Sequence, residues 1–146
     1  MPLGEKPQRT ALRFRSLGFR IKGLGFMGEP FENTEAWKSV RALTNAVYSH
    51  CRREQLSGDF GLRDQLQRAA VSVMNNRAEG WASLHLLEKR QAYNIARRSC
   101  GEVRSMTYVL VGNQYVTPTE QAALLALCLH AGKLITGLIR SLDARA

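Results

Sequence analysis

The sequence has 146 residues, of which 45% are hydrophobic, and a formal net charge of +9. This length suits one domain with a real core, and the composition excludes a disordered chain. Charges interrupt every apolar run before it reaches about 20 residues, so we expect no membrane span. The basic N-terminus is not followed by the apolar region of a secretory signal, and we expect a cytoplasmic protein.

Three cysteines, Cys51, Cys100 and Cys128, form an odd set without a C-x-x-C spacing. This pattern argues against a disulfide framework and predicts reduced, mostly buried thiols. The histidines stand at no spacing typical of a metal site. We therefore expect neither a metal nor another cofactor.

The positive charge is unevenly distributed along the chain. Residues 1–30 hold six Lys or Arg against two acidic residues, whereas residues 31–146 hold fifteen against ten. A charge of this size favours an acidic partner. Residues 1–30 form either a flexible basic arm that touches phosphates or a poorly ordered leader, in which Met27 is an alternative start.

From residue 33 onward the hydrophobic pattern is helical. Apolar residues recur at spacings of three and four from Asn33 or Thr34 to Glu54, which predicts the first helix. A Ser-Gly-Asp break follows, and Asp59 can cap a second helix that stops near Gly80.

Ser83 can cap a third helix, which Gly112 and Asn113 close. The segment Thr-Pro-Thr-Glu at 117–120 predicts a capping box at the start of a fourth helix. No segment alternates with period two for long enough to form a strand. The predicted fold class is therefore all-α, an antiparallel up-down four-helix bundle over residues 31–146.

The segment 64–80 carries the most specific pattern in the chain. It resembles the motif Q-x-x-R-A-A-x-S-I, followed by N-I-A-E-G, of the four-helix-bundle family of 23S rRNA intervening-sequence proteins. The matching residues are Gln65, Arg68, Ala69, Ala70, Ser72, Asn76, Ala78, Glu79 and Gly80. The resemblance continues through residues 95–99 and Glu102, and it covers about residues 31–142.

Three positions depart from the family pattern. Met74 stands where proline is usual, Arg77 replaces an isoleucine and Arg98 replaces a glycine. Without a helix-breaking proline, the second helix should be regular. Arg77 lies at the edge of the apolar stripe, so it must extend toward water or find an acidic partner.

The resemblance implies a toroidal homo-oligomer, a pentamer of bundles, without catalytic activity. The family is also similar to the accessory variability proteins of diversity-generating retroelements, basic pentamers that bind a reverse transcriptase and nucleic acid. We therefore expect a non-enzymatic oligomer whose partners are RNA, DNA or both, and a reverse transcriptase. The alternative is a structural, protein-interaction bundle without a direct nucleic-acid role.

At 100° per residue, Arg90, Arg97 and Arg104 lie roughly opposite the core stripe of the third helix, in a row about 20 Å long. Such a row can span several phosphates, although for one subunit a solvated face is the simpler interpretation. No RNP-like aromatic motif indicates sequence-specific readout. The predicted nucleic-acid-binding residues are Arg90, Arg97, Arg104, Arg98, Lys89, Arg68, Arg63, Arg52 and Arg53.

Polar residues also lie on or beside the apolar stripes of the two middle helices, and we expect a buried hydrogen-bonded network that fixes helix register. Its predicted members are Ser72, Asn76, Glu79, Ser99 and Glu102. Arg68 or Arg77 is the candidate charge partner. The competing interpretation is a catalytic pair formed by Glu79 and Glu102, but no nucleophile, metal cluster or phosphate loop accompanies these carboxylates.

Overall fold

The computed structural model describes residues 30–146, all of whose regular elements are helices. They are the 3-10 helix η1 (Phe31–Asn33) and the α-helices α2 (Glu35–Cys51), α3 (Glu54–Gly58), α4 (Phe60–Ala82), α5 (Leu86–Gly112) and α6 (Pro118–Asp143). The all-α prediction is confirmed. The predictions for the basic arm and for Met27 lie outside the described residues.

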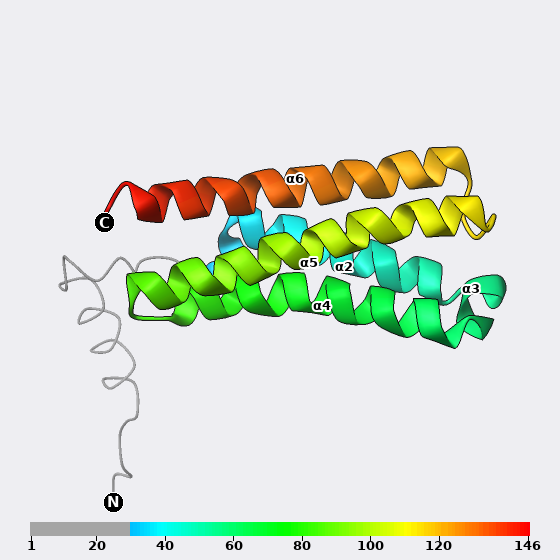
Figure 1. The fold of residues 1–146 in the computed structure, drawn as a ribbon, viewed down its shortest axis with the longest axis horizontal. Helices are drawn as coiled ribbons and strands as arrows, with labels where there is room; N and C mark the ends of the chain where they lie inside the picture. Colours follow the sequence, from blue (N-terminus) through cyan, green and yellow to red (C-terminus); the bar gives the residue numbers. More distant parts are fainter. Residues whose placement is uncertain (1–29) are drawn as a thin grey trace, which may run out of the picture. The chain divides into compact units, whose positions relative to one another are not determined.

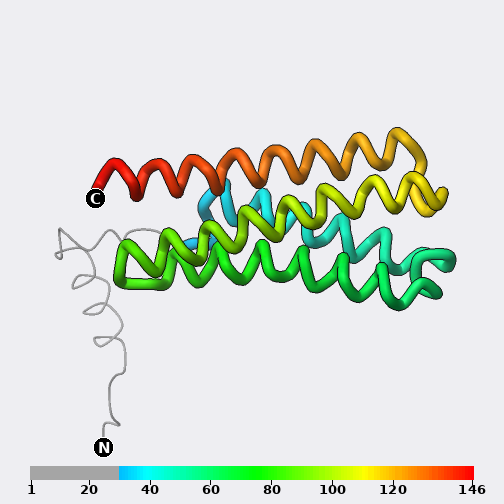
Figure 2. The backbone as a smooth tube through the Cα atoms, in the orientation of Figure 1, coloured from blue at the N-terminus to red at the C-terminus, as the bar shows by residue number. Residues whose placement is uncertain are grey.

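The four long helices pack around one core (Figures 1 and 2). Helix α2 contacts α4 and α6, and α5 contacts the same two helices from the other side. Short connections join α4 to α5 and α5 to α6. Hydrogen bonds between α5 and α6 join Cys100 to Cys128 and Arg90 to Asp143. The earlier residue of α5 therefore contacts the later residue of α6, so these two helices run in opposite directions.

Three of the predicted helix starts are confirmed by their caps. The Thr34 hydroxyl accepts a hydrogen bond from the backbone N–H of Trp37, and the Asp59 carboxylate accepts one from Leu62. At α6, Thr117 and Glu120 cap each other's backbone N–H in the predicted capping box. Such reciprocal bonds satisfy donors that the first turn of a helix leaves free.

Other boundaries differ from the predictions. The first helix ends at Cys51, and a separate short helix, α3, follows it. Ser83 does not cap α5: its hydroxyl donates to the carbonyl oxygen of Glu79, at 2.8 Å, and so closes α4. Helix α5 ends at Gly112 as predicted, but the left-handed residue that turns the chain is Gln114, with φ of 60°.

Within the described residues, α6 is the one helix that is long and apolar enough to meet the criteria of a membrane span. An 18-residue window of this helix has a mean hydropathy of 1.8, and the charge of Lys133 interrupts it as expected. Leu124, Cys128 and Ile135 on its inner face are buried in the bundle core. Core helices meet the same criteria of length and composition, so this finding alone is weak support for a membrane span.

Candidate nucleic-acid interface

The predicted arginine row lies on the outer face of α5, and Arg90, Arg97 and Arg104 are all exposed. The three differ in their partners. The Nε atom of Arg90 donates to Oδ1 of Asp143, the last residue of α6, at 2.8 Å. Arg97 and Arg104 form no ion pair with any residue of the described chain. Two of the three arginines therefore have a charge that no carboxylate of residues 30–146 balances.

Helix α6 adds two cations that the sequence analysis did not include. Lys133 and Arg140 line the same groove as Arg97 and Arg104, a space of about 520 Å³ between α5 and α6. In each helix the two cations stand seven residues apart, about 10 Å along the axis. We call these four residues the cationic groove. None of its lining residues is acidic.

Small residues keep the cationic groove open. Gly101, Gly132 and Gly137 line it, and a side chain built at Gly101 or Gly137 would meet nothing within 4 Å. Glycine in the middle of a helix costs about 0.5–1 kcal/mol relative to alanine. Here these glycines leave room for a ligand to approach the helix backbones between the cationic side chains.

Several of the other predicted binding residues have partners within the protein. Arg63 donates to the Asp64 carboxylate and to the carbonyl oxygen of Ser57. Lys89 donates to the carbonyl oxygens of Gly80 and Trp81, at 3.0 and 2.9 Å, where α4 ends. A cation at a helix C-terminus is favourable because unpaired carbonyl groups gather there.

Arg53 forms an ion pair with Glu120 of the capping box. The carboxylate also accepts a hydrogen bond from the Thr117 backbone N–H, at 3.0 Å. The Arg53 hydrogen bond, followed by that of Thr117, lowers the pKa of Glu120 to about 2. Arg53 therefore links α6 to the segment between α2 and α3.

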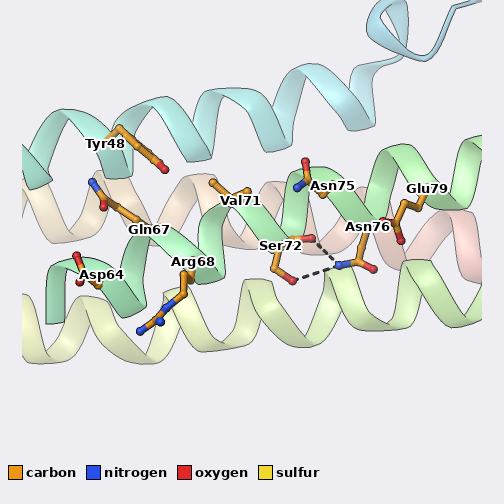
Figure 3. A pocket seen from close by; sticks show the side chains of 9 residues that line it. All are labelled: Tyr48, Asp64, Gln67, Arg68, Val71, Ser72, Asn75, Asn76 and Glu79. Atoms are coloured by element: carbon orange, nitrogen blue, oxygen red, sulfur yellow. Dashed lines mark hydrogen bonds between the residues drawn. The ribbon is translucent and has the colours of Figure 1, made fainter. Parts of the chain in front are cut away.

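The remaining predicted cations, Arg52, Arg68 and Arg98, are exposed. Of these, Arg68 lines a second groove along the outer side of α4, about 660 Å³ in volume (Figure 3). Its lining residues are mostly polar: Tyr48, Asp64, Gln67, Arg68, Val71, Ser72, Asn75, Asn76 and Glu79. One arginine faces two carboxylates in this mixed groove, which makes it a poor match for a polyanion.

Part of the predicted polar network is present between α4 and α5. The hydroxyl groups of Ser72 and Ser99 lie 2.8 Å apart. Figure 3 shows the Asn76 amide, which donates to the Ser72 carbonyl and hydroxyl oxygens. Glu79 and Glu102 do not join them: both are exposed, and no hydrogen bond or ion pair connects them within the described residues. The structure therefore assembles neither the five-membered network nor the carboxylate pair.

The expectation that Arg77 extends toward water or pairs with an acidic residue is wrong. This side chain is fully buried, and its Nη2 atom donates to the Thr34 hydroxyl at 2.9 Å. The guanidinium lies 5.3 Å from the Trp81 ring centre and 5.6 Å from that of Tyr93. Its Nε and Nη1 atoms make no hydrogen bond, and burial lowers the pKa of this arginine. Two aromatic faces thus replace the expected carboxylate.

Metal ligands do not gather in the described part of the chain. Residues 30–146 contain no group of three or more His, Cys, Asp or Glu side chains placed to hold an ion. The three cysteines are buried and unpaired. The arrangement with the clearest chemical character is the cationic groove, which suits a ligand carrying several negative charges.

Comparison with known proteins agrees with this fold. The model of the 23S rRNA-intervening sequence protein family matches residues 32–137. A crystal structure of a protein of unknown function from the S23 ribosomal protein family of Bacteroides thetaiotaomicron is similar, with a TM-score of 0.66 and 18% identity. The similarity covers 71% of this chain and 97% of that one. No curated protein matches the sequence. Because the family model spans most of the helical region, the chain belongs to the 23S rRNA-intervening sequence protein family.

Proposed function

We propose that this protein binds the phosphate backbone of RNA or DNA through the cationic groove, without catalysis and without sequence readout. The observation that carries the proposal is the groove itself, four cations from two helices with no acidic lining residue. A polyanion that binds there releases its own counterions, and that release drives association.

The side chains of the groove suit this ligand chemically. Three of the four cations are arginines, whose planar guanidinium groups can bind phosphate oxygens in pairs. Their positions on helices fix the spacing of the cations along the groove. No acidic group among the lining residues opposes the field of these cations.

The proposed assembly strengthens this field. The long helices form an antiparallel up-down four-helix bundle, and the bundles form a ring-shaped homo-oligomer, with a pentamer expected from the family resemblance. Each subunit then contributes one cationic groove, so one nucleic-acid chain can contact several grooves at once. Multivalent contact of this kind raises affinity without a new type of contact.

A second candidate function is protein interaction, including binding to a reverse transcriptase. Leu84, Leu86 and Leu87 at the connection between α4 and α5 are exposed by 68%, 42% and 77%. Adjacent exposed leucines are typical of a surface that a protein partner covers. Binding to such a partner with no affinity for nucleic acid would favour this function over the first.

The test compares two variants that lose the same charge. One replaces the groove cations (R97Q/R104Q/K133Q/R140Q), and the control replaces four cations elsewhere (R52Q/R53Q/R63Q/R68Q). Fluorescence anisotropy with labelled mixed-sequence RNA and DNA measures affinity at one fixed salt concentration.

We expect the groove variant to bind on the order of 100-fold more weakly than the wild type, with the control within about threefold. Equal losses in both variants would show that net charge, and not the cationic groove, determines binding. Unchanged affinity in the groove variant would contradict the proposal. Circular dichroism and sedimentation confirm that both variants keep the fold and the oligomeric state of the wild type.

A further inference from the structure

Two cysteines meet at the floor of the cationic groove. Cys100 on α5 and Cys128 on α6 both line the groove, yet their residues are only 4% and 2% exposed. The Sγ atom of Cys100 donates to the backbone carbonyl oxygen of Cys128 at 3.2 Å. The two residues are therefore direct neighbours across the interface between the helices.

The backbones of α5 and α6 approach closely at this point. A side chain built at Gly132, one turn after Cys128, would lie 3.9 Å from the Cys100 sulfur. Because the Cys100 sulfur already contacts the backbone of Cys128, rotation about the two Cα–Cβ bonds is the movement that would bring the sulfur atoms together. A disulfide here would join two helices that already pack together.

The surroundings distinguish the two sulfur atoms. The contact between the two cysteines lowers the pKa of Cys100 and raises the pKa of Cys128, and the positive charge of Arg104 lowers the pKa of both. The thiolate is the reactive form of a cysteine, so Cys100 is the first to react. The groove also gives a small oxidant a path to this sulfur atom.

We propose that Cys100 and Cys128 form a thiol-modification site, which a peroxide oxidises to a disulfide between α5 and α6 beneath the cationic groove. This inference does not depend on nucleic-acid binding. It rests on the contact between the two residues and on their shared position at the groove floor.

The oxidation proceeds in two steps. The Cys100 thiolate attacks one oxygen of hydrogen peroxide, the O–O bond breaks, and the departing hydroxide takes up the proton released by Cys100. The product is a sulfenic acid and one water. The Cys128 sulfur then attacks the sulfenic sulfur, the S–O bond breaks, and hydroxide leaves with the thiol proton of Cys128 as a second water. In total, two thiols lose two electrons and two protons, and one peroxide becomes two waters.

The third cysteine supplies a matched comparison, because Cys51 is also buried but lies on α2. The full-length folded protein and its C51S, C100S and C128S variants are treated with hydrogen peroxide. Intact mass spectrometry and non-reducing peptide mapping locate the products, and dimedone traps sulfenic acid. Circular dichroism before treatment shows which variants keep the native helix content.

We expect wild type and C51S to lose the mass of two hydrogen atoms, with Cys100 linked to Cys128 in the peptide map. In C128S, dimedone should label Cys100. A link that forms only after unfolding in urea, or oxidation that adds oxygen to the folded C51S variant without linking it, would overturn the proposal. The peptide map of the wild type decides the outcome even if a serine variant does not fold.

Discussion

Two arginines of α4 and two arginines of α5 have opposite uses. On α4, Arg63 pairs with Asp64 and Arg77 is buried between two aromatic rings. On α5, Arg97 and Arg104 face the open cationic groove and have no carboxylate partner in the described part of the chain. The partners around an arginine, and not its presence in a helix, therefore separate a structural cation from a ligand-facing one. Changes at Arg63 or Arg77 should reduce stability, whereas changes in the cationic groove should reduce binding.

The largest expected effect on stability comes from Arg77. R77A removes most of a fully buried side chain, and we expect it to lower the free energy of unfolding by about 2–5 kcal/mol, as for other large-to-small core changes. R77M keeps an apolar stem of similar length and removes Nε and Nη1, which make no hydrogen bond, together with Nη2, which donates to Thr34. Relief of the desolvation of Nε and Nη1 offsets the loss of the ring contacts and of the hydrogen bond to Thr34, so R77M should lie within about 1 kcal/mol of wild type.

Urea denaturation followed by circular dichroism measures both Arg77 variants. Equal destabilisation in R77A and R77M would show that the contacts of the guanidinium group outweigh the cost of burying it. A loss of nucleic-acid affinity in folded R77M would contradict the structural assignment of this residue.

Like the arginines, the glycines include one in a tightly packed position and one that lines the cationic groove. A methyl group at Gly80 would overlap the buried ring of Tyr93, so G80A should lower stability by about 1–3 kcal/mol. G137A is the matched change in the cationic groove, where a methyl group would meet nothing within 4 Å. Alanine is the better helix former, so G137A should raise stability by about 0.5–1 kcal/mol.

Thermal denaturation compares the two glycine variants with wild type. A destabilised G137A would contradict the assignment of this glycine to an open groove. A G80A variant as stable as wild type would contradict the close packing of Gly80 against Tyr93, because that contact would then tolerate a side chain.

The smallest expected effect concerns Glu120, which pairs with Arg53. Its pKa falls from an ordinary 4.5 to about 2 on folding. A carboxyl whose pKa is lower in the folded state stabilises the protein above its ordinary pKa, and this stabilisation is lost as the pH falls from about 4.5 to about 2. E120Q should therefore melt slightly below wild type at neutral pH, and the two should converge at the acid end of this range.

Differential scanning calorimetry across this range measures the convergence. A difference between E120Q and wild type that does not change with pH would exclude the ion pair as its source. Because Arg53 loses its partner in E120Q, this variant also tests whether an unpaired arginine outside the cationic groove increases binding. We expect no increase.

Local signals predicted most of the fold. The caps at Asp59 and Thr117 were readable because a capping residue and its helix lie next to each other in sequence. Ser83 was misplaced because a serine between two helices can close the first or begin the second. The choice depends on how the turn packs, which the sequence pattern does not specify.

The candidate site was less predictable, since it forms between two helices. The spacing of Arg97 and Arg104 indicated an outward row on α5, but the contribution of Lys133 and Arg140 depends on the register of α6 against α5. Likewise, no pattern within α4 showed that Arg77 would find Trp81 and Tyr93 instead of an acid. Contacts between elements require the three-dimensional arrangement.

The salt dependence of nucleic-acid binding tests the central claim most directly. For duplex DNA, the slope of the logarithm of affinity against the logarithm of salt concentration changes by about 0.9 for each phosphate contact. The four cations of the groove therefore predict a slope that is shallower by about 3–4 in R97Q/R104Q/K133Q/R140Q than in wild type. In R52Q/R53Q/R63Q/R68Q the slope should change by less than about 1. A groove variant with the slope of wild type, or two variants with equal slopes, would contradict the account.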